Sequence, residues 1–371
     1  MTNCFSEVKK NFGFGCMRLP MQGDEVDYAE FCKMADEFIA RGFNYFDTAH
    51  GYIGGKSEIA VRECLVKRHR REEYLLADKL TEPYFRSEAD VRPFILDQLS
   101  ILGVEYLDFY LMHAQNARNF AKFQACRAYE TAFRMKEEGY LRHVGISFHD
   151  SAAVLDRILS EYPQIEFVQI QFNYFDVVNP IVQSMDCYEV CKKHGKPVVV
   201  MEPVKGGTLV NLPPKAREIY ARLGTMSEAS YAIRYAAGFE GIFMVLSGMS
   251  NMAQMLDNLS FMQDFQPLSA KEVQAVEAVR QVLLSVEQIP CTGCRYCTDG
   301  CPQKIAIPDL FTLMNQKTLY KTWTTNAEYA QKTKDGGKAS ACVGCGKCER
   351  ACPQMLPIRK LLKGVAQEFE K

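Results

Sequence analysis

The chain has 371 residues, 47% of them apolar and 24% charged, a composition typical of globular proteins and unlike that of disordered or collagen-like chains. Its 44 Lys and Arg residues nearly balance 45 Asp and Glu residues, and the resulting net charge of -1 argues against nucleic acid as a main partner. No window approaches the ~18 uninterrupted apolar residues of a membrane span, and residues 1–20 lack the apolar core of a secretion signal. We therefore expect a cytoplasmic protein without a membrane span.

Short apolar runs alternate with amphipathic stretches along most of the chain. The runs predict buried parallel strands at 43–47, 74–77, 107–112, 143–147, 167–170, 198–201 and 242–246, with a weaker pattern at 12–17. Helical patterns occupy 28–40, 57–68, 89–102, 125–138 and 181–194. The expected helix starts are Asp27, Ser87 and Asp150, and the expected helix ends are Gly42, Gly103, Gly139 and Gly195.

About eight such strand–helix units predict an α/β fold, a closed (β/α)8 TIM barrel. No GxGxxG motif follows the first strand, which counts against an open dinucleotide-binding sheet.

Eight of the fifteen cysteines lie in two tight groups near the C-terminus. The groups are Cys291, Cys294, Cys297 and Cys301, followed by Cys342, Cys345, Cys348 and Cys352. Each has the CxxCxxCxxxCP spacing that binds 4Fe–4S clusters, in which three close thiolates hold one cluster and the fourth ligates its neighbour. The alternative is structural zinc, since CxxC pairs also occur in zinc ribbons. The change in composition predicts a barrel over 1–285 and an iron–sulfur domain over 286–371.

The C-terminal segment resembles the dicluster ferredoxin modules found at the ends of larger redox enzymes. Helical patterns at 309–319 and 358–369 follow the two Cys-Pro pairs, which predicts a small, mainly helical ferredoxin-like domain. Several lysines in this segment are candidates for docking an acidic electron donor, although a solvated polar face is the preferred explanation: Lys317, Lys321, Lys332, Lys334 and Lys338.

Chemically versatile side chains stand at the carboxyl ends of three successive predicted strands. These strands end at Asp47, Lys79 and His113, and Tyr52 lies on the loop between the first two. Catalytic groups of such barrels lie at this rim, and these residue types suit proton transfer to a carbonyl oxygen. We expect Lys79 to lower the pKa of Tyr52, Asp47 to hold Lys79 charged, and His113 to orient the substrate oxygen. Each residue alone also has a structural explanation, but the four together favour catalysis.

Over roughly residues 8–265, the chain resembles the aldo/keto reductase family. Residues 42–49, with the sequence GFNYFDTA, are similar to the first signature of the family, and residues 139–147 resemble its fifth-strand segment. The resemblance implies hydride transfer between a nicotinamide ring and a carbonyl carbon. It also implies a catalytic tetrad with Tyr52 as the general acid: Asp47, Tyr52, Lys79 and His113.

The resemblance further implies a set of cofactor contacts: Cys16, Met17, Ser147, Gln169, Met201, Pro203, Val204, Gly206, Ser247, Gly248, Met249, Ser250, Gln254 and Asn258. The chain departs from the family pattern at several of these. Met201 replaces the aromatic residue that stacks under the nicotinamide, and Gly248 and Gln254 replace basic residues that grip a 2′-phosphate. Backbone amides of 248–250 and the following helix can bind a pyrophosphate or a flavin phosphate. Arg18 is a candidate partner for a substrate carboxylate or for a structural ion pair.

Three functions fit these features. The leading hypothesis is an iron–sulfur oxidoreductase of aldo/keto reductase type that reduces a carbonyl or enone with NAD(P)H. In it, two 4Fe–4S clusters exchange electrons with a ferredoxin or flavodoxin. The second is a ferredoxin-dependent reductase in which FMN bridges the one-electron clusters and two-electron chemistry. The third is an electron-transfer or redox-sensing protein without turnover, against which the complete tetrad argues.

Overall fold

The computed structural model describes residues 4–224, 226–286, 288–320, 324–334 and 336–370. The chain forms two compact units, one of residues 1–203 and 229–270, the other of residues 204–228 and 271–371. The segment 204–228, which follows a barrel strand in the sequence, thus belongs to the same unit as the two cysteine groups. The domain boundary at residue 285 stays a prediction.

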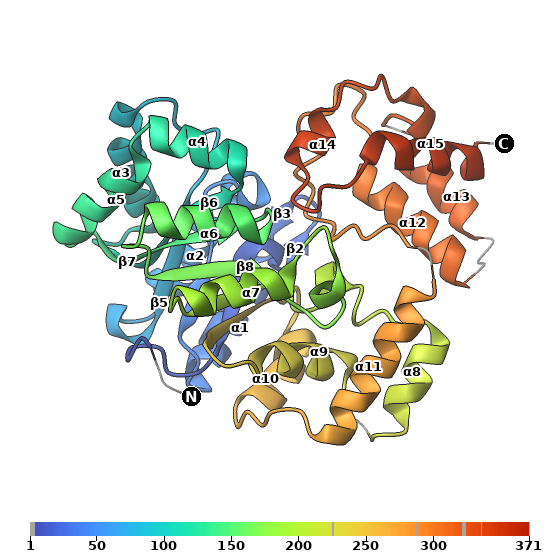
Figure 1. The fold of residues 1–371 in the computed structure, drawn as a ribbon, viewed down its shortest axis with the longest axis horizontal. Helices are drawn as coiled ribbons and strands as arrows, with labels where there is room; N and C mark the ends of the chain where they lie inside the picture. The colour runs from blue at the N-terminus through green and yellow to red at the C-terminus, as the bar shows by residue number, and fades with distance from the viewer. Residues whose placement is uncertain (1–3, 225, 287, 321–323, 335, 371) are drawn as a thin grey trace. The chain divides into compact units, whose positions relative to one another are not determined.

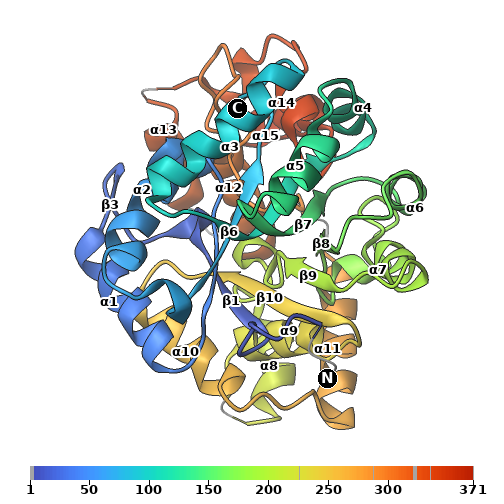
Figure 2. The ribbon, with the colours of Figure 1, turned by 90° about the vertical axis from the view of Figure 1, so that its left-hand side faces the viewer.

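In the described part of the first unit, eight parallel strands close into a barrel, in the order β1-β10-β9-β8-β7-β6-β5-β4. Figures 1 and 2 show helices around these strands, and the (β/α)8 prediction is confirmed. Every predicted strand is present, because each is an apolar run that can be buried on both faces. The strands are β1 (Phe12–Gly15), β4 (Tyr45–Asp47), β5 (Leu75–Leu80), β6 (Leu107–Gln115), β7 (Leu141–Phe148), β8 (Phe167–Gln171), β9 (Val198–Met201) and β10 (Ile242–Gly248).

The helices of this unit are α1 (Tyr28–Ala40), α2 (Lys56–Val61), α3 (Glu88–Leu102), α4 (Ala117–Ala125), α5 (Ala128–Glu137), α6 (Ala152–Glu161), α7 (Ser184–Lys193), α9 (Glu228–Ala237) and α10 (Met252–Met262). A short hairpin, β2 (Met21–Gln22) and β3 (Glu25–Val26), follows the first strand. A disulfide joins Cys32 of α1 to Cys64. No helix in the described ranges is both long enough and apolar enough to cross a membrane.

Several sequence-based boundaries were wrong. The expected helix 181–194 begins only at Ser184, because Gln183 before it adopts a left-handed conformation with φ 51°. The expected helix 125–138 begins only at Ala128, because Arg127 adopts a left-handed conformation with φ 46° and separates α4 from α5. The expected start at Asp150 is one residue early, since Ser151 precedes the first helical residue of α6. The expected strand 12–17 ends at Gly15, where the chain turns into the 3-10 turn Cys16–Arg18. The four expected glycine helix ends all have positive φ, as predicted.

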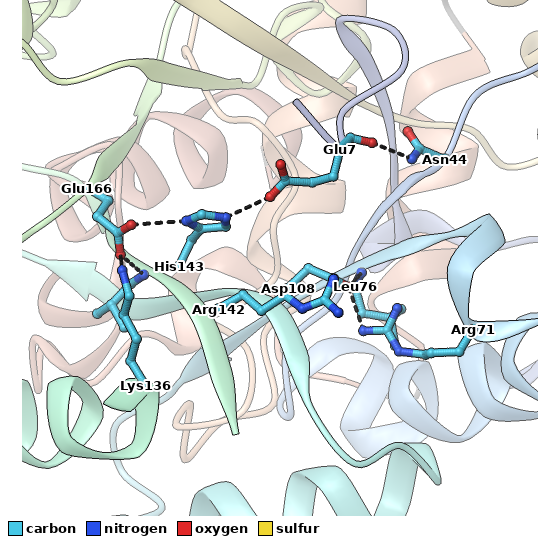
Figure 3. Close-up of polar contacts among 10 residues, drawn as sticks. Glu7, Asn44, Arg71, Leu76, Asp108, Lys136, Arg142, His143 and Glu166 are labelled. Atoms are coloured by element: carbon cyan, nitrogen blue, oxygen red, sulfur yellow. Dashed lines mark hydrogen bonds and ion pairs between the residues drawn. The ribbon is translucent and has the colours of Figure 1, made fainter. Parts of the chain in front are cut away.

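The N-terminal segment lies against the amino-terminal ends of the barrel strands. Phe5 packs on the rings of Phe109 and Phe243, with centroid distances of 5.2 and 4.8 Å. His143 of β7 joins this segment to the barrel: one ring nitrogen lies 2.6 Å from a Glu7 oxygen and the other 3.0 Å from a Glu166 oxygen (Figure 3). These contacts leave the carboxyl ends of the strands as the face for chemistry.

The described part of the second unit is mainly helical, as expected. Its helices are α8 (Pro214–Ala221), α11 (Ala270–Leu284), α12 (Ile307–Tyr320), α13 (Thr324–Lys332), α14 (Lys347–Ala351) and α15 (Ile358–Phe369). Their core contains Leu310, Phe311, Ile358 and Val365, all at most 1% exposed, and several cluster cysteines pack against it. A small apolar core thus supports both cysteine groups.

Candidate functional site

The barrel brings the four predicted catalytic residues to one rim. Asp47 is the last residue of β4, Tyr52 begins the turn that follows it, Lys79 lies near the end of β5, and His113 lies near the end of β6. All four side chains are buried. The residue after Tyr52, Ile53, has φ 54°, a left-handed conformation that is costly for a β-branched residue and typical of functional sites.

Lys79 and Asp47 form a buried ion pair. The Lys79 ammonium donates to Asp47 Oδ1 at 2.7 Å and to the Thr48 carbonyl at 2.6 Å, and the two side chains are 0% and 4% exposed. Burial raises the pKa of Asp47, and the charge of Lys79 opposes that rise. The other oxygen, Asp47 Oδ2, has no hydrogen-bond partner among the described residues. Lys79 is therefore held by two hydrogen-bond acceptors in a buried site, where water screens the charges little.

The environment of Tyr52 corrects one sequence-based expectation. Burial, followed by the negative charges of Asp47 and Asp78, raises the pKa of Tyr52 well above its ordinary value. Lys79 does not reverse this, because its ammonium lies 4.8 Å from the centre of the Tyr52 ring and donates to Asp47 and Thr48. The phenol therefore keeps its proton at neutral pH, which is the state that a general acid needs.

His113 is neutral at physiological pH. Burial, together with the charge of Lys79, lowers the pKa of His113 well below 6.5. Its ring lies edge-on to that of Tyr52, with centroids 6.0 Å apart. Nδ1 of His113 lies 2.7 Å from Thr81 Oγ1, and Thr81 is a residue that the sequence did not single out. When Thr81 donates this bond, the hydrogen of His113 stands on Nε2.

A buried carboxyl pair lies behind Lys79 and was also missed. Asp78 and Glu58 are both 0% exposed, and burial, with the adjacent Glu58, raises the pKa of Asp78 well above its usual range. Glu58 accepts from Gln98 at 3.1 Å and lies 2.9 Å from His50 Nδ1. Asp78 could have been predicted from the alternation of side chains along a strand. Because Lys79 points into the barrel, its neighbour Asp78 must point outward, toward the helices.

The expected nicotinamide contacts divide between the two units. Ser147, near the end of β7, and Gln169, in the middle of β8, are buried and paired in the sheet, and the partly buried Met201 ends β9. Ser147 Oγ accepts from the Ala114 amide at 2.8 Å, and Gln169 Oε1 has no hydrogen-bond partner in the described part of the chain. An orphaned buried amide oxygen fits a ligand that donates there, such as a carboxamide.

Three residues that follow β9 were also expected to contact the cofactor: Pro203, Val204 and Gly206. Pro203 is the last residue of the first unit at this point, whereas Val204 and Gly206 belong to the second unit. Their assignment to the cofactor pocket stays a prediction. Cys16 and Met17 follow β1; Cys16 is fully buried, and burial together with Asp47 raises the pKa of its thiol, which keeps it neutral.

The expected phosphate segment connects β10 to α10 and is internally braced. Ser250 donates its amide to Gln254 Oε1 at 2.8 Å, and Asn258 donates to Ser247 Oγ at 3.0 Å. Met249 is buried beneath the loop. Gln254 thus braces the loop, and its contact with the cofactor stays a prediction.

Arg18 lies over this segment. A Cβ built on Gly248 would lie only 3.1 Å from Cδ of Arg18, and Ser250 Oγ donates to the Arg18 carbonyl at 3.0 Å. The segment has no basic residue at positions 248 and 254, but the side chain of Arg18, from the turn after β1, packs against Gly248.

The eight clustered cysteines line two cavities, each with thiols from both groups. The first cavity is lined by Cys291, Cys294, Cys297 and Cys352, and the second by Cys342, Cys345, Cys348 and Cys301. The last cysteine of each group therefore reaches the other cavity, which is the ligand pattern of two-cluster ferredoxins. In the described ranges, no three His, Cys, Asp or Glu side chains converge on a point that would suit one metal ion.

Comparison with known proteins gives two family matches. The sequence model of the Aldo/keto reductase family matches residues 11–281, and that of a 4Fe-4S dicluster domain matches residues 290–357. The uncharacterized oxidoreductase YqkF of Bacillus subtilis is 25% identical over 302 residues, 72% of this chain and 91% of YqkF. The L-galactose dehydrogenase of Arabidopsis thaliana is 24% identical over 291 residues, 72% of this chain and 89% of that protein.

Solved structures agree on the fold of the barrel. The holo form of an aldo-keto reductase from Bacillus halodurans has a TM-score of 0.57 at 25% identity, with 72% of this chain and 91% of that chain covered. An aldo-keto reductase from Klebsiella pneumoniae, solved with NADPH, has a TM-score of 0.59 at 17% identity, with 73% and 90% covered. At that identity the second likeness shows the fold alone.

Proposed function

Because this chain belongs to the aldo/keto reductase family and carries a 4Fe-4S dicluster domain, it is an oxidoreductase, and we propose that it reduces a carbonyl or enone with NAD(P)H. The observation that carries the proposal is the buried phenol of Tyr52 beside the Lys79–Asp47 ion pair and the neutral His113. This arrangement offers two hydrogen-bond donors to one carbonyl oxygen, which is what carbonyl reduction requires.

Tyr52 acts as the general acid. When bound, NAD(P)H supplies a hydride to the carbonyl carbon, and the oxygen gains the negative charge. A phenol with a raised pKa holds its proton until that charge develops, and an alkoxide is basic enough to take it. Lys79 stabilises the phenolate that is left, since its ammonium lies over the Tyr52 ring.

His113 orients the substrate. A neutral imidazole donates through Nε2 when Thr81 occupies Nδ1, and the low pKa of His113 keeps it from competing with Tyr52 for the role of acid. We propose Thr81 as a positioning residue, because its hydroxyl fixes the Nε2–H tautomer of His113 when it donates to Nδ1 at 2.7 Å and not to the Lys79 carbonyl at 3.3 Å.

In this proposal, residues at and near the carboxyl ends of β7 to β10 would hold the nicotinamide cofactor. Ser147 Oγ already accepts a hydrogen bond from the Ala114 amide, so the hydroxyl hydrogen of Ser147 can be donated to the carboxamide oxygen. Gln169 Oε1 can accept from the carboxamide nitrogen. Arg18 and the backbone amides of Gly248 and Met249 would bind the phosphates, since the Ser250 amide already donates to Gln254.

In this proposal, the eight cysteines bind two 4Fe–4S clusters. Three thiols of one group and the last thiol of the other surround each cavity, which is a complete ligand set. Bound clusters supply one-electron transfer, for which a ferredoxin or flavodoxin is the proposed partner.

The test is the turnover of 4-nitrobenzaldehyde by the anaerobically purified full chain with NADPH or NADH. Tyr52→Phe should lower kcat by roughly 10²- to 10⁴-fold and leave the Kd for the nucleotide unchanged, since the lost hydroxyl acts only in proton transfer. Tyr162→Phe, which removes a phenol that bonds Glu130 outside the site, is the matched control. Equal turnover by wild type and Tyr52→Phe would overturn Tyr52 as the general acid, and no turnover by either would favour a barrel that binds ligands without catalysis.

A further inference from the structure

The two cysteine groups repeat one sequence pattern but differ in exposure. Thr292 and Val343 occupy equivalent positions, each directly after the first cysteine of its group. Thr292 is 2% exposed, whereas Val343 is 62% exposed. Gly344 and Cys345, which follow Val343, are exposed as well. One cysteine loop is therefore covered by protein and the other faces solvent.

A turn of the same unit covers the first cysteine loop. Gly206 has φ 60°, and a Cβ at this position would lie 2.1 Å from the Thr292 carbonyl oxygen. The backbone of the turn thus rests directly on the first cysteine loop, an approach that only glycine permits. A separate protein cannot reach Thr292 without displacing this turn.

Positive charge gathers around the second loop. A Cβ at Gly346 would lie 3.3 Å from a guanidinium nitrogen of Arg350 and 3.9 Å from Cζ of Arg359. Arg359 also donates to the Gly344 carbonyl at 3.4 Å. Lys347 lines the second cavity together with Arg359. Three basic side chains therefore surround the exposed stretch Val343–Cys345.

Most of this charge is uncompensated. Arg359 is paired with Glu349 at 2.8 Å, but among the described residues neither Lys347 nor Arg350 forms an ion pair, and both are exposed. By contrast, the basic residue of the first loop, Arg295, is bound through two hydrogen bonds to Asp309, at 2.8 and 2.9 Å. Of the basic residues named here, those without an ion pair therefore lie beside the exposed second loop.

We propose that Val343, Lys347 and Arg350 form the docking surface for a separate, acidic, one-electron carrier protein of the ferredoxin class. An exposed apolar residue within a charged rim is the usual anatomy of a transient interface, and opposite charge accelerates the encounter of the two proteins. The proposal rests on the proposed function only in that the eight cysteines hold clusters. It assigns the second loop to the partner, whereas the first is closed by the chain's own turn.

The experiment measures anaerobic binding of an acidic bacterial two-cluster ferredoxin to the cluster-loaded full chain by calorimetry. Lys347→Glu/Arg350→Glu should raise the Kd at least tenfold at low salt, and wild-type binding should weaken steeply as salt is added. The matched control is Lys215→Glu/Lys271→Glu, the same charge change at exposed lysines of α8 and α11. Figures 1 and 2 show these two helices far from α14. This control should change the Kd less than twofold, and cytochrome c, a basic carrier, should not bind.

A second readout separates docking from cluster tuning. Iron content and the reduction potentials of both clusters are measured for each variant. A tenfold weaker Kd with unchanged iron content supports the surface. Shifted potentials with an unchanged Kd, or equal weakening by the two double variants, would overturn it. If the glutamate variant loses iron, Lys347→Gln/Arg350→Gln replaces it, with a severalfold weaker Kd expected. If the wild-type chain does not bind the ferredoxin but still reduces 4-nitrobenzaldehyde with NADPH, the proposed docking surface is wrong and the proposed function stands.

Discussion

Removal of Lys79 should destabilise the barrel strongly, and removal of both members of its ion pair should not. Lys79→Met leaves the Asp47 carboxylate buried with neither oxygen bonded to a cation, since Oδ1 loses Lys79 and Oδ2 has no partner in the described residues. Breaking a buried pair costs about 3–5 kcal/mol, a large share of the roughly 5–15 kcal/mol that stabilises a typical protein. Asp47→Asn should cost a similar amount, because the ammonium then has only the Thr48 carbonyl.

The double variant Asp47→Asn/Lys79→Met buries no charge. It should be more stable than either single variant, with a coupling of several kcal/mol. The destabilisation of Lys79→Met also has a predicted pH dependence. The folded-state pKa of Asp47 then rises further above its unfolded value of about 3.9, so the loss is largest at neutral pH and shrinks as the pH falls through the folded-state pKa.

The assay is urea unfolding of the anaerobic full chain, followed by circular dichroism, with visible absorbance reporting the cluster unit separately. Measurements at several pH values between about 5 and 8 cover the expected window. The reasoning is refuted if the double variant is as unstable as the sum of the two singles. A cost below about 1 kcal/mol for Lys79→Met would refute it as well, because that is the value of a solvent-exposed pair.

Two further predictions concern stability. Burial alone would lower the pKa of His143, but hydrogen bonds to Glu166 and Glu7 raise it, so its ion pairs stabilise the fold below about pH 6.5 and are lost as the pH rises through the raised pKa. His143→Asn should therefore cost about 1 kcal/mol in thermal unfolding at pH 6 and less at pH 9, and a pH-independent cost would contradict this. Gly206→Ala should cost clearly more than Gly195→Ala and lower the iron content. Both glycines have positive φ, which costs about 1–2 kcal/mol for alanine, but only Gly206 has backbone within 4 Å of the added Cβ. Equal costs and equal iron contents would show that the turn does not rest on the cysteine loop.

Much of the fold could be predicted because its signals are local. Each barrel strand is a short apolar run, and helix-ending glycines at Gly42, Gly103, Gly139 and Gly195 mark the turns into four strands. The placement of Asp47, Lys79 and His113 on one rim follows from the same periodicity, since carboxyl ends of parallel strands meet at one edge.

The missed features depend on contacts distant in sequence. Nothing local predicts that Arg127 adopts positive φ and divides a helical pattern, or that the turn at Gly206 packs against Thr292. The pKa of Tyr52 could not be predicted from the presence of Lys79, because the direction of the shift depends on where the ammonium points. Glu58 pairs with Asp78 only once α2 packs on β5.

The most direct test of the central claim is the fate of the hydride. The full chain reduces 4-nitrobenzaldehyde with NADPH that carries deuterium at the transferred position, and the alcohol is analysed by mass spectrometry. We predict one deuterium on the carbinol carbon, delivered directly in the barrel, with the rate but not the labelling reduced by Tyr52→Phe. Loss of the label to solvent would contradict direct transfer and would indicate that a flavin carries the electrons between nicotinamide and substrate.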